Sequence, residues 1–310
     1  MKCTRSLKLL ITSLALASPA PAVVIQIGNG SGNTTAPVDD PGFANVGQLL
    51  GASMVYIRNG WVLSASHVVN ASTLPATVSF NGMSYGTNST TFERLTNGGT
   101  PGLSEFTDLV MFQLTSWDSL AEVQVASTVP SVLVSVVMAG AGRDREASLT
   151  SWDVDTAPDP DVWTEVSPPP PADREGYKTL SSRSLRWGTN TVESVNLSVD
   201  TGNGDVVSFS TDFDESDGTS EAHAVVGDSG GGVFAKNLLG DWELVGIMHA
   251  VSTFNGQPSG ANTAVFGNQT FSADLSFYSD QINAISSIPE PSAIILIITG
   301  MLFFCQRRQR

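Results

Sequence analysis

From Asp40 onward, the apolar residues of this chain occur in short runs separated by glycine, proline and asparagine. The runs are rich in Val, Ile and Phe, and none is longer than about eight residues, which is typical of β-strands rather than long helices. Clear examples are Met54–Arg58, Trp61–Ser66, Leu109–Leu114, Val132–Met138, Val206–Ser210 and Trp242–Met248. The pattern predicts an all-β fold, more like a barrel or sandwich than βαβ units.

One helix is predicted at 275–287, where Leu275, Tyr278, Ile282 and Ile285 recur every three or four residues and form one apolar face.

Two other stretches depart from the strand pattern. Residues 23–39 are rich in Gly, Asn and Thr and predict a flexible N-terminal arm, and residues 151–190 are rich in proline and charge. Four consecutive prolines at 168–171 favour polyproline geometry, so we expect 151–190 to be an exposed insertion.

Both ends of the chain are typical of targeting segments. Residues 1–22 combine a basic start, an apolar stretch and small residues before a cleavage site after Ala22, which predicts a secretory signal peptide. The alternative for this segment is a buried first helix. At the other end, Pro289-Glu290-Pro291 is followed by an apolar run from Ala293 to Cys305 and an arginine-rich tail. That run would form a helix of roughly 20 Å, shorter than the roughly 30 Å hydrocarbon core of a bilayer.

The order Pro-Glu-Pro, hydrophobic helix and basic tail in 288–310 resembles the PEP-CTERM sorting signal of Gram-negative bacteria. The resemblance implies recognition and removal by an exosortase-type enzyme, and a short transmembrane helix that anchors the chain transiently in the inner membrane. A simple tail anchor is the alternative. Because Cys3 and Cys305 both lie in these end segments, we expect no disulfide in the mature chain.

The charge of the chain excludes one class of partner. Segments 1–22 and 289–310 hold six of the 15 basic residues and one of the 30 acidic residues, so residues 23–288 carry nine basic and 29 acidic groups, a net charge of −20. Binding to nucleic acid needs a basic face, so nucleic acid is not an expected partner. The acidic cluster Asp212, Asp214, Glu215 and Asp217 lacks the turn glycine of an EF-hand, so we expect a solvated loop without metal.

Three separate segments carry residue types suited to nucleophilic catalysis. Ser229 lies in Gly227-Asp228-Ser229-Gly230-Gly231-Gly232, where glycines permit tight turns and the close approach of a substrate. A serine hydroxyl needs a base to become a nucleophile, and His67 follows an apolar strand. Asp108 opens another apolar run and could orient the imidazole.

Taken together, SASHVV, TDLVMFQL and GDSGGG resemble the motifs of the chymotrypsin/trypsin-like serine proteases, in the same chain order. The resemblance covers about 40–287 and implies two six-stranded antiparallel β-barrels, at about 40–130 and 131–287, followed by the C-terminal helix. It also implies a catalytic triad of His67, Asp108 and Ser229. The N–H groups of Gly227 and Ser229 would form the oxyanion hole.

The chain also departs from that family. Val68 stands where many relatives carry a disulfide cysteine, and no Ile-Val-Gly-Gly activation site is present. Signal cleavage would expose Val23, which could pair with Asp228 as the freed N-terminus does in trypsin-like enzymes; otherwise other donors satisfy Asp228.

His223 occupies the position from which relatives bind basic P1 side chains, which argues against that preference. His223, His249 and Val251 would line the specificity pocket, where the histidines would favour acidic P1 residues. The alternative is that both histidines are structural and hydrogen-bonded to the backbone.

These features predict an exported serine endopeptidase that acts in the periplasm, at the cell surface or in the extracellular matrix. Its expected partners are polypeptide substrates, a signal peptidase and an exosortase-type enzyme, with no cofactor and no membrane contact outside the C-terminal segment. The alternative is a non-catalytic surface or matrix-binding protein on a protease-like fold. An acidic β-sandwich with a chance GDSGGG string would leave His67 and Asp108 unexplained.

Overall fold

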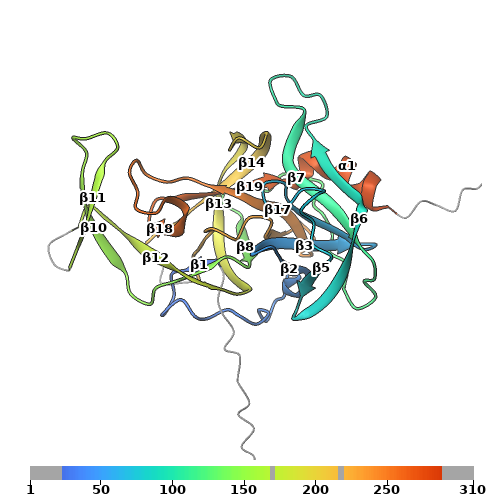
Figure 1. Cartoon of the computed structure of the whole chain (residues 1–310), viewed down its shortest axis with the longest axis horizontal. Coiled ribbons are helices and arrows are strands. Elements are labelled where there is room, and N and C mark those ends of the chain that lie inside the picture. The colour runs from blue at the N-terminus through green and yellow to red at the C-terminus, as the bar shows by residue number, and fades with distance from the viewer. Residues whose placement is uncertain (1–22, 168–171, 216–219, 288–310) are drawn as a thin grey trace, which may run out of the picture.

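The computed structural model describes residues 23–167, 172–215 and 220–287 (Figure 1). The expected signal peptide, the PEP-CTERM-like segment, both cysteines and the four consecutive prolines lie outside these ranges. In the described part of the chain, no helix is both long and apolar enough to span a membrane.

The first barrel is closed by six antiparallel strands in the order β2-β3-β4-β7-β6-β5. A short 3-10 helix, η1 (Phe43–Asn45), precedes it. Its strands are β2 (Val46–Leu49), β3 (Ala52–Arg58), β4 (Trp61–Ala65), β5 (Thr77–Phe80), β6 (Met83–Thr96) and β7 (Phe106–Leu114).

The second barrel is closed by six antiparallel strands in the order β13-β14-β19-β17-β16-β8. Its strands are β8 (Ser135–Gly140), β13 (Arg186–Asp200), β14 (Asp205–Asp212), β16 (Gly232–Lys236), β17 (Trp242–Val251) and β19 (Gln269–Asp274). Several strands in the chain exceed the expected eight residues, because bulges bend long strands such as β6 and β13 around their barrels.

Strands β3, β4 and β7 of the first barrel are largely apolar on both faces because both faces are buried. In β3, Met54 and Tyr56 fill the barrel interior, whereas the alternating Val55 and Ile57 belong to a second core. That second core also contains residues of the second barrel, such as Phe234. The continuous apolar runs in the sequence therefore reflect the packing of one barrel against the other.

The C-terminal helix α1 (Leu275–Ser286) confirms the expected helix within one residue. The Asp274 side chain caps its first turn by accepting from the N–H of Ser276 at 2.9 Å. Leu275, Tyr278 and Ile282 are buried in the core between the barrels. The expected fold class, all-β with two six-stranded barrels and a C-terminal helix as in trypsin, is therefore confirmed.

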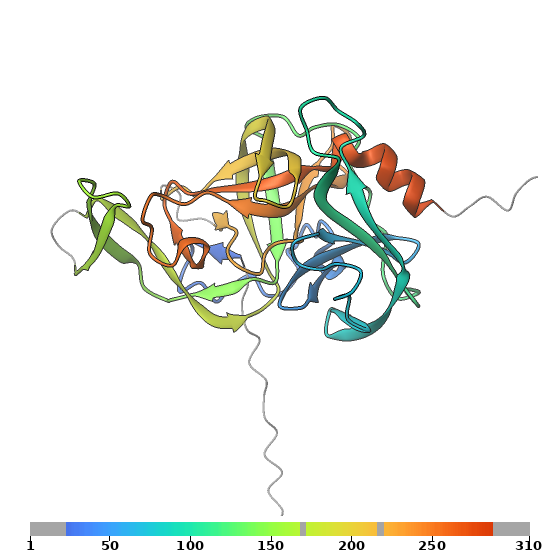
Figure 2. The same ribbon diagram turned by 45° about the horizontal axis from the view of Figure 1, so that its top comes forward.

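The segment 151–190 contains paired strands rather than an extended loop. Outside the barrels, a five-stranded sheet is built from β9 (Arg143–Arg145), β10 (Thr150–Asp155), β11 (Val162–Val166), β12 (Arg174–Arg183) and β18 (Thr263–Val265). A second 3-10 helix, η2 (Gly260–Asn262), precedes β18. Strands β10 and β11 project from the barrels at the end of the molecule opposite α1, as Figure 2 shows. The residues of β11 are exposed or half-buried, and they belong to a folded sheet.

The start of the expected flexible arm is built into the second barrel. Val23, Val24 and Ile25 are buried, and β1 (Val24–Ile25) pairs with β15 (Ala222–His223). The apolar start of the arm thus supplies core residues. The Gly- and Asn-rich residues that follow made the whole segment look flexible in the sequence.

Candidate active site

A pocket of about 450 Å³ lies where the two barrels meet; His67 and Ser229 line it, and Asp108 contacts His67. His67 follows β4 and Asp108 lies in the paired strand β7, so these two residues come from the first barrel. Ser229 lies in the loop before β16 of the second barrel and lines the pocket together with His67. The sequence-predicted residues are therefore collected in one region.

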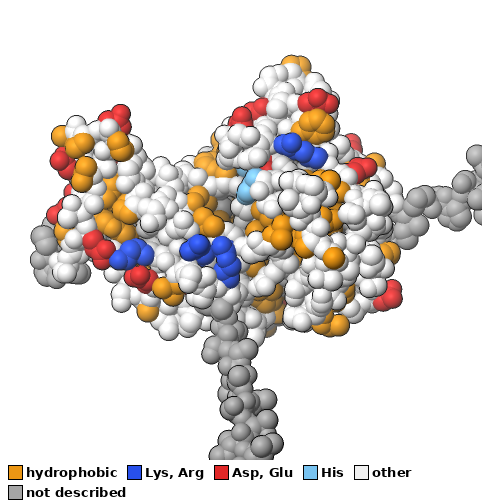
Figure 3. Space-filling view, viewed as in Figure 1, with side chains coloured by type: hydrophobic (Ala, Val, Ile, Leu, Met, Phe, Trp, Pro, Cys, Tyr) orange, Lys and Arg blue, Asp and Glu red, His pale blue; other side chains and the backbone are white. Residues whose placement is uncertain are grey.

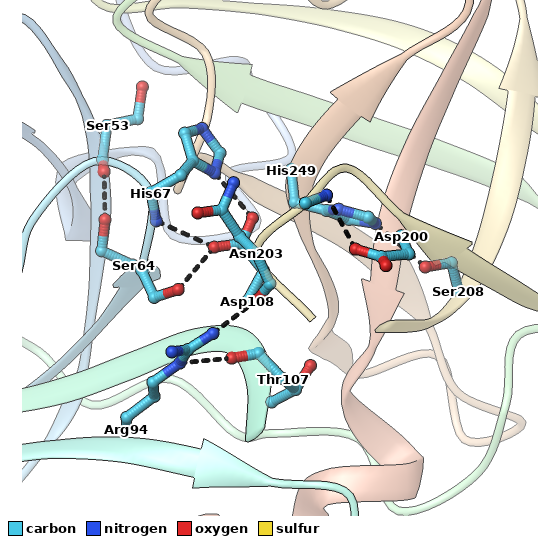
Figure 4. A network of polar contacts seen from close by, with 12 residues as sticks. Ser53, Ser64, His67, Arg94, Thr107, Asp108, Asp200, Asn203, Ser208 and His249 are labelled. Carbon is cyan, nitrogen blue, oxygen red and sulfur yellow. Dashed lines mark hydrogen bonds and ion pairs between the residues drawn. The ribbon is translucent and has the colours of Figure 1, made fainter. Parts of the chain in front are cut away.

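His67 and Asp108 are held by several hydrogen bonds (Figure 4). The His67 Nδ1 atom lies 2.6 Å from Asp108 Oδ2, and the His67 backbone N–H donates to Asp108 Oδ1 at 2.8 Å. Ser66 Oγ also donates to Asp108 Oδ1, at 2.6 Å. The carboxylate thus fixes the Nδ1–H tautomer and leaves Nε2 of the partly exposed imidazole as the basic nitrogen.

The Asp108 carboxylate is fully buried but remains ionised. Burial pushes its pKa up, and the contact with His67 together with the hydrogen bonds from Ser66 and the His67 backbone outweighs burial, so its pKa lies below its usual range. Arg94 supports the strand beside it by donating from Nε to the Thr107 carbonyl at 3.0 Å. A buried negative charge is therefore present to stabilise an imidazolium at His67.

The loop that carries Ser229 is anchored to the first barrel. The Ser53 N–H donates to the Ser229 carbonyl at 2.9 Å, and Ser53 Oγ donates to the Gly227 carbonyl at 2.8 Å. Gly230 packs so closely that a Cβ would lie 2.1 Å from the Ser53 carbonyl oxygen, and its φ of 85° also favours glycine. The glycine after Ser229 is thus required by the contact between the barrels.

The N–H groups of Gly227 and Ser229, which the family resemblance assigns to an oxyanion hole, have no acceptor among the described residues, and both residues line the pocket. By contrast, the neighbouring Asp228 N–H donates to the Val225 carbonyl at 2.9 Å. Two free backbone donors beside a serine hydroxyl can stabilise a developing oxyanion.

Asp228 is fully buried behind Ser229 and accepts hydrogen bonds only from backbone N–H groups among the described residues. Its Oδ1 accepts from Val23 at 3.3 Å and Gly142 at 2.8 Å, and its Oδ2 accepts from Val225 at 2.8 Å. Burial raises the pKa of Asp228 to about 6. The suggested pair of Val23 and Asp228 is therefore in contact, and Asp228 lacks a hydrogen-bonded cation.

Arg145 holds the chain next to Val23 in place. Its buried guanidinium donates to the carbonyls of Ile25, Gln26 and Gly28 at 2.7, 3.0 and 2.8 Å, respectively. It also stacks over the Tyr177 ring at 3.8 Å from the ring centroid. Charge-assisted hydrogen bonds to several carbonyls fix the path of residues 25–28.

His249 and Val251 line the pocket. Ser208 Oγ donates to the Val206 carbonyl, so it must accept from Nε2 of His249, which it contacts at 2.9 Å. The His249 Nδ1 atom then carries no proton, and it has no partner among the described residues. Burial lowers the pKa of His249 to about 4, so this side chain is neutral at neutral pH.

His223 is not among the residues that line the pocket. It is buried, with Nδ1 at 3.0 Å from Thr270 Oγ1 and its ring stacked on Phe213. Burial lowers its pKa to about 3. The assignment of His223 to the specificity pocket is corrected, because its side chain packs against Phe213 and Thr270 and does not line the pocket, and its polar partner is a threonine hydroxyl rather than the backbone.

Sequence reasoning missed three residues of this site, namely Ser53, Ser66 and Arg183. Ser66 precedes His67 and could have been found as a local donor to Asp108. Ser53 reaches the loop of Ser229 only because the two barrels pack together, and Arg183 reaches the pocket only through the course of β12. No group of three or more His, Cys, Asp or Glu side chains that could hold a metal ion is found in the described ranges.

Comparison with known proteins gives structural similarities only. No protein-family model matches the chain, and no curated protein matches it. Among solved structures, neuropsin, a serine protease expressed in the limbic system of mouse brain, is 16% identical with a TM-score of 0.47, covering 83% of this chain and 99% of neuropsin. The inactive form of the Rv3671c protease is 12% identical with a TM-score of 0.44, covering 79% of this chain and 91% of that chain. Similarities this distant say nothing about the function of this chain.

Proposed function

We propose that this protein is a serine endopeptidase that cleaves peptide bonds through His67, Asp108 and Ser229. The observation that carries the proposal is the buried contact of 2.6 Å between His67 Nδ1 and Asp108 Oδ2, beside a serine that lines the same pocket. The free N–H groups of Gly227 and Ser229 support it further.

In the proposed reaction, Ser229 Oγ attacks the carbonyl carbon of the substrate while His67 Nε2 accepts the hydroxyl proton. The oxygen of the tetrahedral intermediate becomes negative and accepts hydrogen bonds from the N–H groups of Gly227 and Ser229. His67 then donates its proton to the leaving amine, and the C–N bond breaks to leave an ester on Ser229. Water, deprotonated by His67, hydrolyses this ester and restores the serine.

A fluorophosphonate probe tests the proposal directly, because it reacts with an activated serine and does not depend on a known substrate. We expect one probe per chain on protein that begins at Val23, no labelling of Ser229→Ala, and full labelling of Ser84→Ala, whose serine is exposed in β6. A folded protein that does not react would favour the non-catalytic binding protein instead.

We also propose that the protein is exported and then processed at both ends. The composition of 1–22 and the PEP-CTERM-like order of 288–310 support this proposal. Mass spectrometry of the mature protein tests it. We expect an N-terminus at Val23 and the loss of the C-terminal segment, and intact ends would contradict the proposal.

Signal cleavage would create the α-amino group of Val23, and we propose that this group pairs with Asp228 and activates the enzyme. The contact of 3.3 Å between Val23 N and Asp228 Oδ1 supports this role. The free α-ammonium would supply the cation that the buried carboxylate lacks among its hydrogen-bond partners.

A further inference from the structure

Arg183, at the end of β12, is the only Arg, Lys, Asp or Glu residue that lines the candidate active-site pocket in the described part of the chain. Most other lining residues are apolar, and His249 is neutral at neutral pH. The pocket therefore presents one permanent positive charge to a substrate.

The Arg183 side chain packs directly on the loop of the oxyanion hole. A Cβ placed on Gly227 would lie 1.7 Å from Nη1 of Arg183, and a Cβ placed on Gly51 would lie 3.8 Å from its Nε. The guanidinium thus lies between the oxyanion loop and the turn that joins β2 and β3 of the first barrel. The guanidinium therefore lies beside the N–H groups proposed to hold the oxyanion.

The charge of Arg183 is not paired within the described residues. Its Nη1 donates to the Val226 carbonyl at 3.1 Å, whereas the ion pairs found involve other residues. The buried Asp228 accepts from backbone N–H groups and not from Arg183. Burial and the neighbouring Arg143 lower the pKa of Arg183, and the weaker attraction of the buried Asp228 does not offset them.

Basic residues are few in this chain, and two of them, Arg143 and Arg183, lie near each other. Six of the nine basic residues in 23–288 lie between 143 and 186, a range that also holds nine acidic residues. Figure 3 shows Lys and Arg side chains on the same face as the exposed histidine, beside the hollow in which it lies. A bound anionic group would relieve the repulsion between Arg143 and Arg183.

The position of Arg183 also indicates which part of a substrate it meets. His67 must reach the leaving nitrogen, so the leaving segment starts on the side of the first barrel. Leu50 and Gly51 of the first barrel line the pocket and Arg183 lies next to Gly51, whereas His249 and Val251 line the pocket from the second barrel. The acyl part of the substrate then lies against the second barrel, and the leaving segment passes Arg183.

We propose that Arg183 binds an acidic side chain of the substrate on the leaving-group side of the cleaved bond. This inference rests on the proposed endopeptidase function. It assigns the substrate class of that site as polypeptides with Asp or Glu just after the cleaved bond, a preference that neither His223 nor His249 supplies because both are neutral at neutral pH.

The partitioning of the acyl-enzyme tests the inference apart from the first step of catalysis. Protein starting at Val23 is acylated with a peptide ester, and amidated dipeptides compete with water for the ester on Ser229. We expect Glu-Ala-amide to capture the acyl group about five- to tenfold better than Gln-Ala-amide, as a charge-assisted hydrogen bond predicts. Lys-Ala-amide should be the poorest acceptor, and added salt should reduce the differences.

Three variants make the test specific. Arg183→Gln should remove the preference for Glu over Gln, and Arg183→Lys should keep part of it. Arg174→Gln, on the exposed start of the same strand, should leave it intact. The partition ratio is measured after acylation, so a slower first step does not change it. Failure of all acylation would overturn the proposed function, whereas efficient acylation with equal capture of Glu and Gln would overturn only the role of Arg183.

Discussion

The backbone N–H of Ser53 donates to the carbonyl of Ser229 at 2.9 Å and so joins the first barrel to the loop of the candidate nucleophile in the second. The hydroxyl of the same Ser53 donates to the Gly227 carbonyl and accepts from the Ala141 N–H at 2.7 Å. One small residue in β3 therefore joins two segments of the second barrel, the loop at 227–229 and the chain at Ala141, to the first. The relative position of the barrels and the shape of the oxyanion loop are set by the same contacts.

Replacement of Ser53 by alanine keeps the backbone hydrogen bond but leaves the Gly227 carbonyl and the Ala141 N–H without their partner. We expect a loss of about 1–3 kcal/mol in the free energy of unfolding, the usual cost of unsatisfied buried polar groups. The oxyanion loop should also loosen, and kcat should fall by about tenfold. Urea denaturation and peptide hydrolysis measure the two effects. Ser84→Ala, on the exposed side of the same barrel, should match the wild type in both.

Replacement of Asp108 by asparagine should preserve the fold and remove most of the activity. The amide cannot stabilise an imidazolium, and it favours the wrong tautomer of His67, so we expect kcat to fall by about 10³- to 10⁴-fold. Steady-state hydrolysis and circular dichroism are the measurements. Asp118→Asn, at an exposed position, serves as the control. Nearly normal hydrolysis by Asp108→Asn would show that the 2.6 Å contact with His67 is structural.

The N-terminus offers a prediction on both activity and pH dependence. The kcat/KM of protein that begins at Val23 should be about 100-fold higher than that of protein with one extra N-terminal residue. The extra residue removes the buried α-ammonium that would pair with Asp228. In the extended protein, burial raises the pKa of Asp228 to about 6, so the folded state favours the protonated carboxyl. The contribution of the protonated Asp228 to the stability of the extended protein is present below about pH 4 and is lost as the pH rises through about 6.

Protein that begins at Val23 should lack this loss, because the ammonium stabilises the charged carboxylate. Thermal unfolding of both forms between pH 4 and 7 measures the difference. Equal activity and equal pH profiles of the two forms would rule out the activating role of Val23.

The buried His223 and His249 predict a second effect of pH on stability. It is opposite to that of Asp228, because stability is lost as the pH falls. Burial lowers their pKa values to about 3 and about 4, so both are neutral in the folded state while the unfolded chain takes up protons below about pH 6.5. Stability is therefore complete above pH 6.5 and falls with acidification, by about 1.4 kcal/mol per pH unit for each histidine. Urea denaturation from pH 7 to 4 of protein starting at Val23 measures the slope.

His223→Asn should remove the contribution of His223 to the change of stability with pH, whatever its effect on stability at neutral pH. The contribution of His249 should remain in this variant. An unchanged slope would show that His223 is protonated in the folded protein.

The sequence predicted the features that depend on local pattern. Short apolar runs indicated the barrels, the spacing of Leu275, Tyr278 and Ile282 indicated α1, and three motifs pointed to residues that the structure brings to one region. The protease family resemblance linked these motifs, because nothing in the spacing of His67, Asp108 and Ser229 alone requires that they meet.

The remaining features depend on pairing between distant segments. The expected arm at 23–39 contains β1, whose partner β15 lies about 200 residues away, and the insertion at 151–190 joins β18 near the C-terminus. Arg183 reaches the pocket only because β12 crosses toward it. The composition of a segment does not reveal which strand it pairs with, because the register of a sheet is set by contacts between residues far apart in the sequence.

The hydrogen bonds from Arg145 to the carbonyls of Ile25, Gln26 and Gly28 have a consequence for maturation. These hydrogen bonds need no free α-amino group, so the segment can dock before any cut is made. Under the proposed activation, latent and competent enzyme would then differ by a single covalent bond at residue 23 and not by the insertion of a long tail. Export itself would act as the on-switch, without a dedicated activating protease.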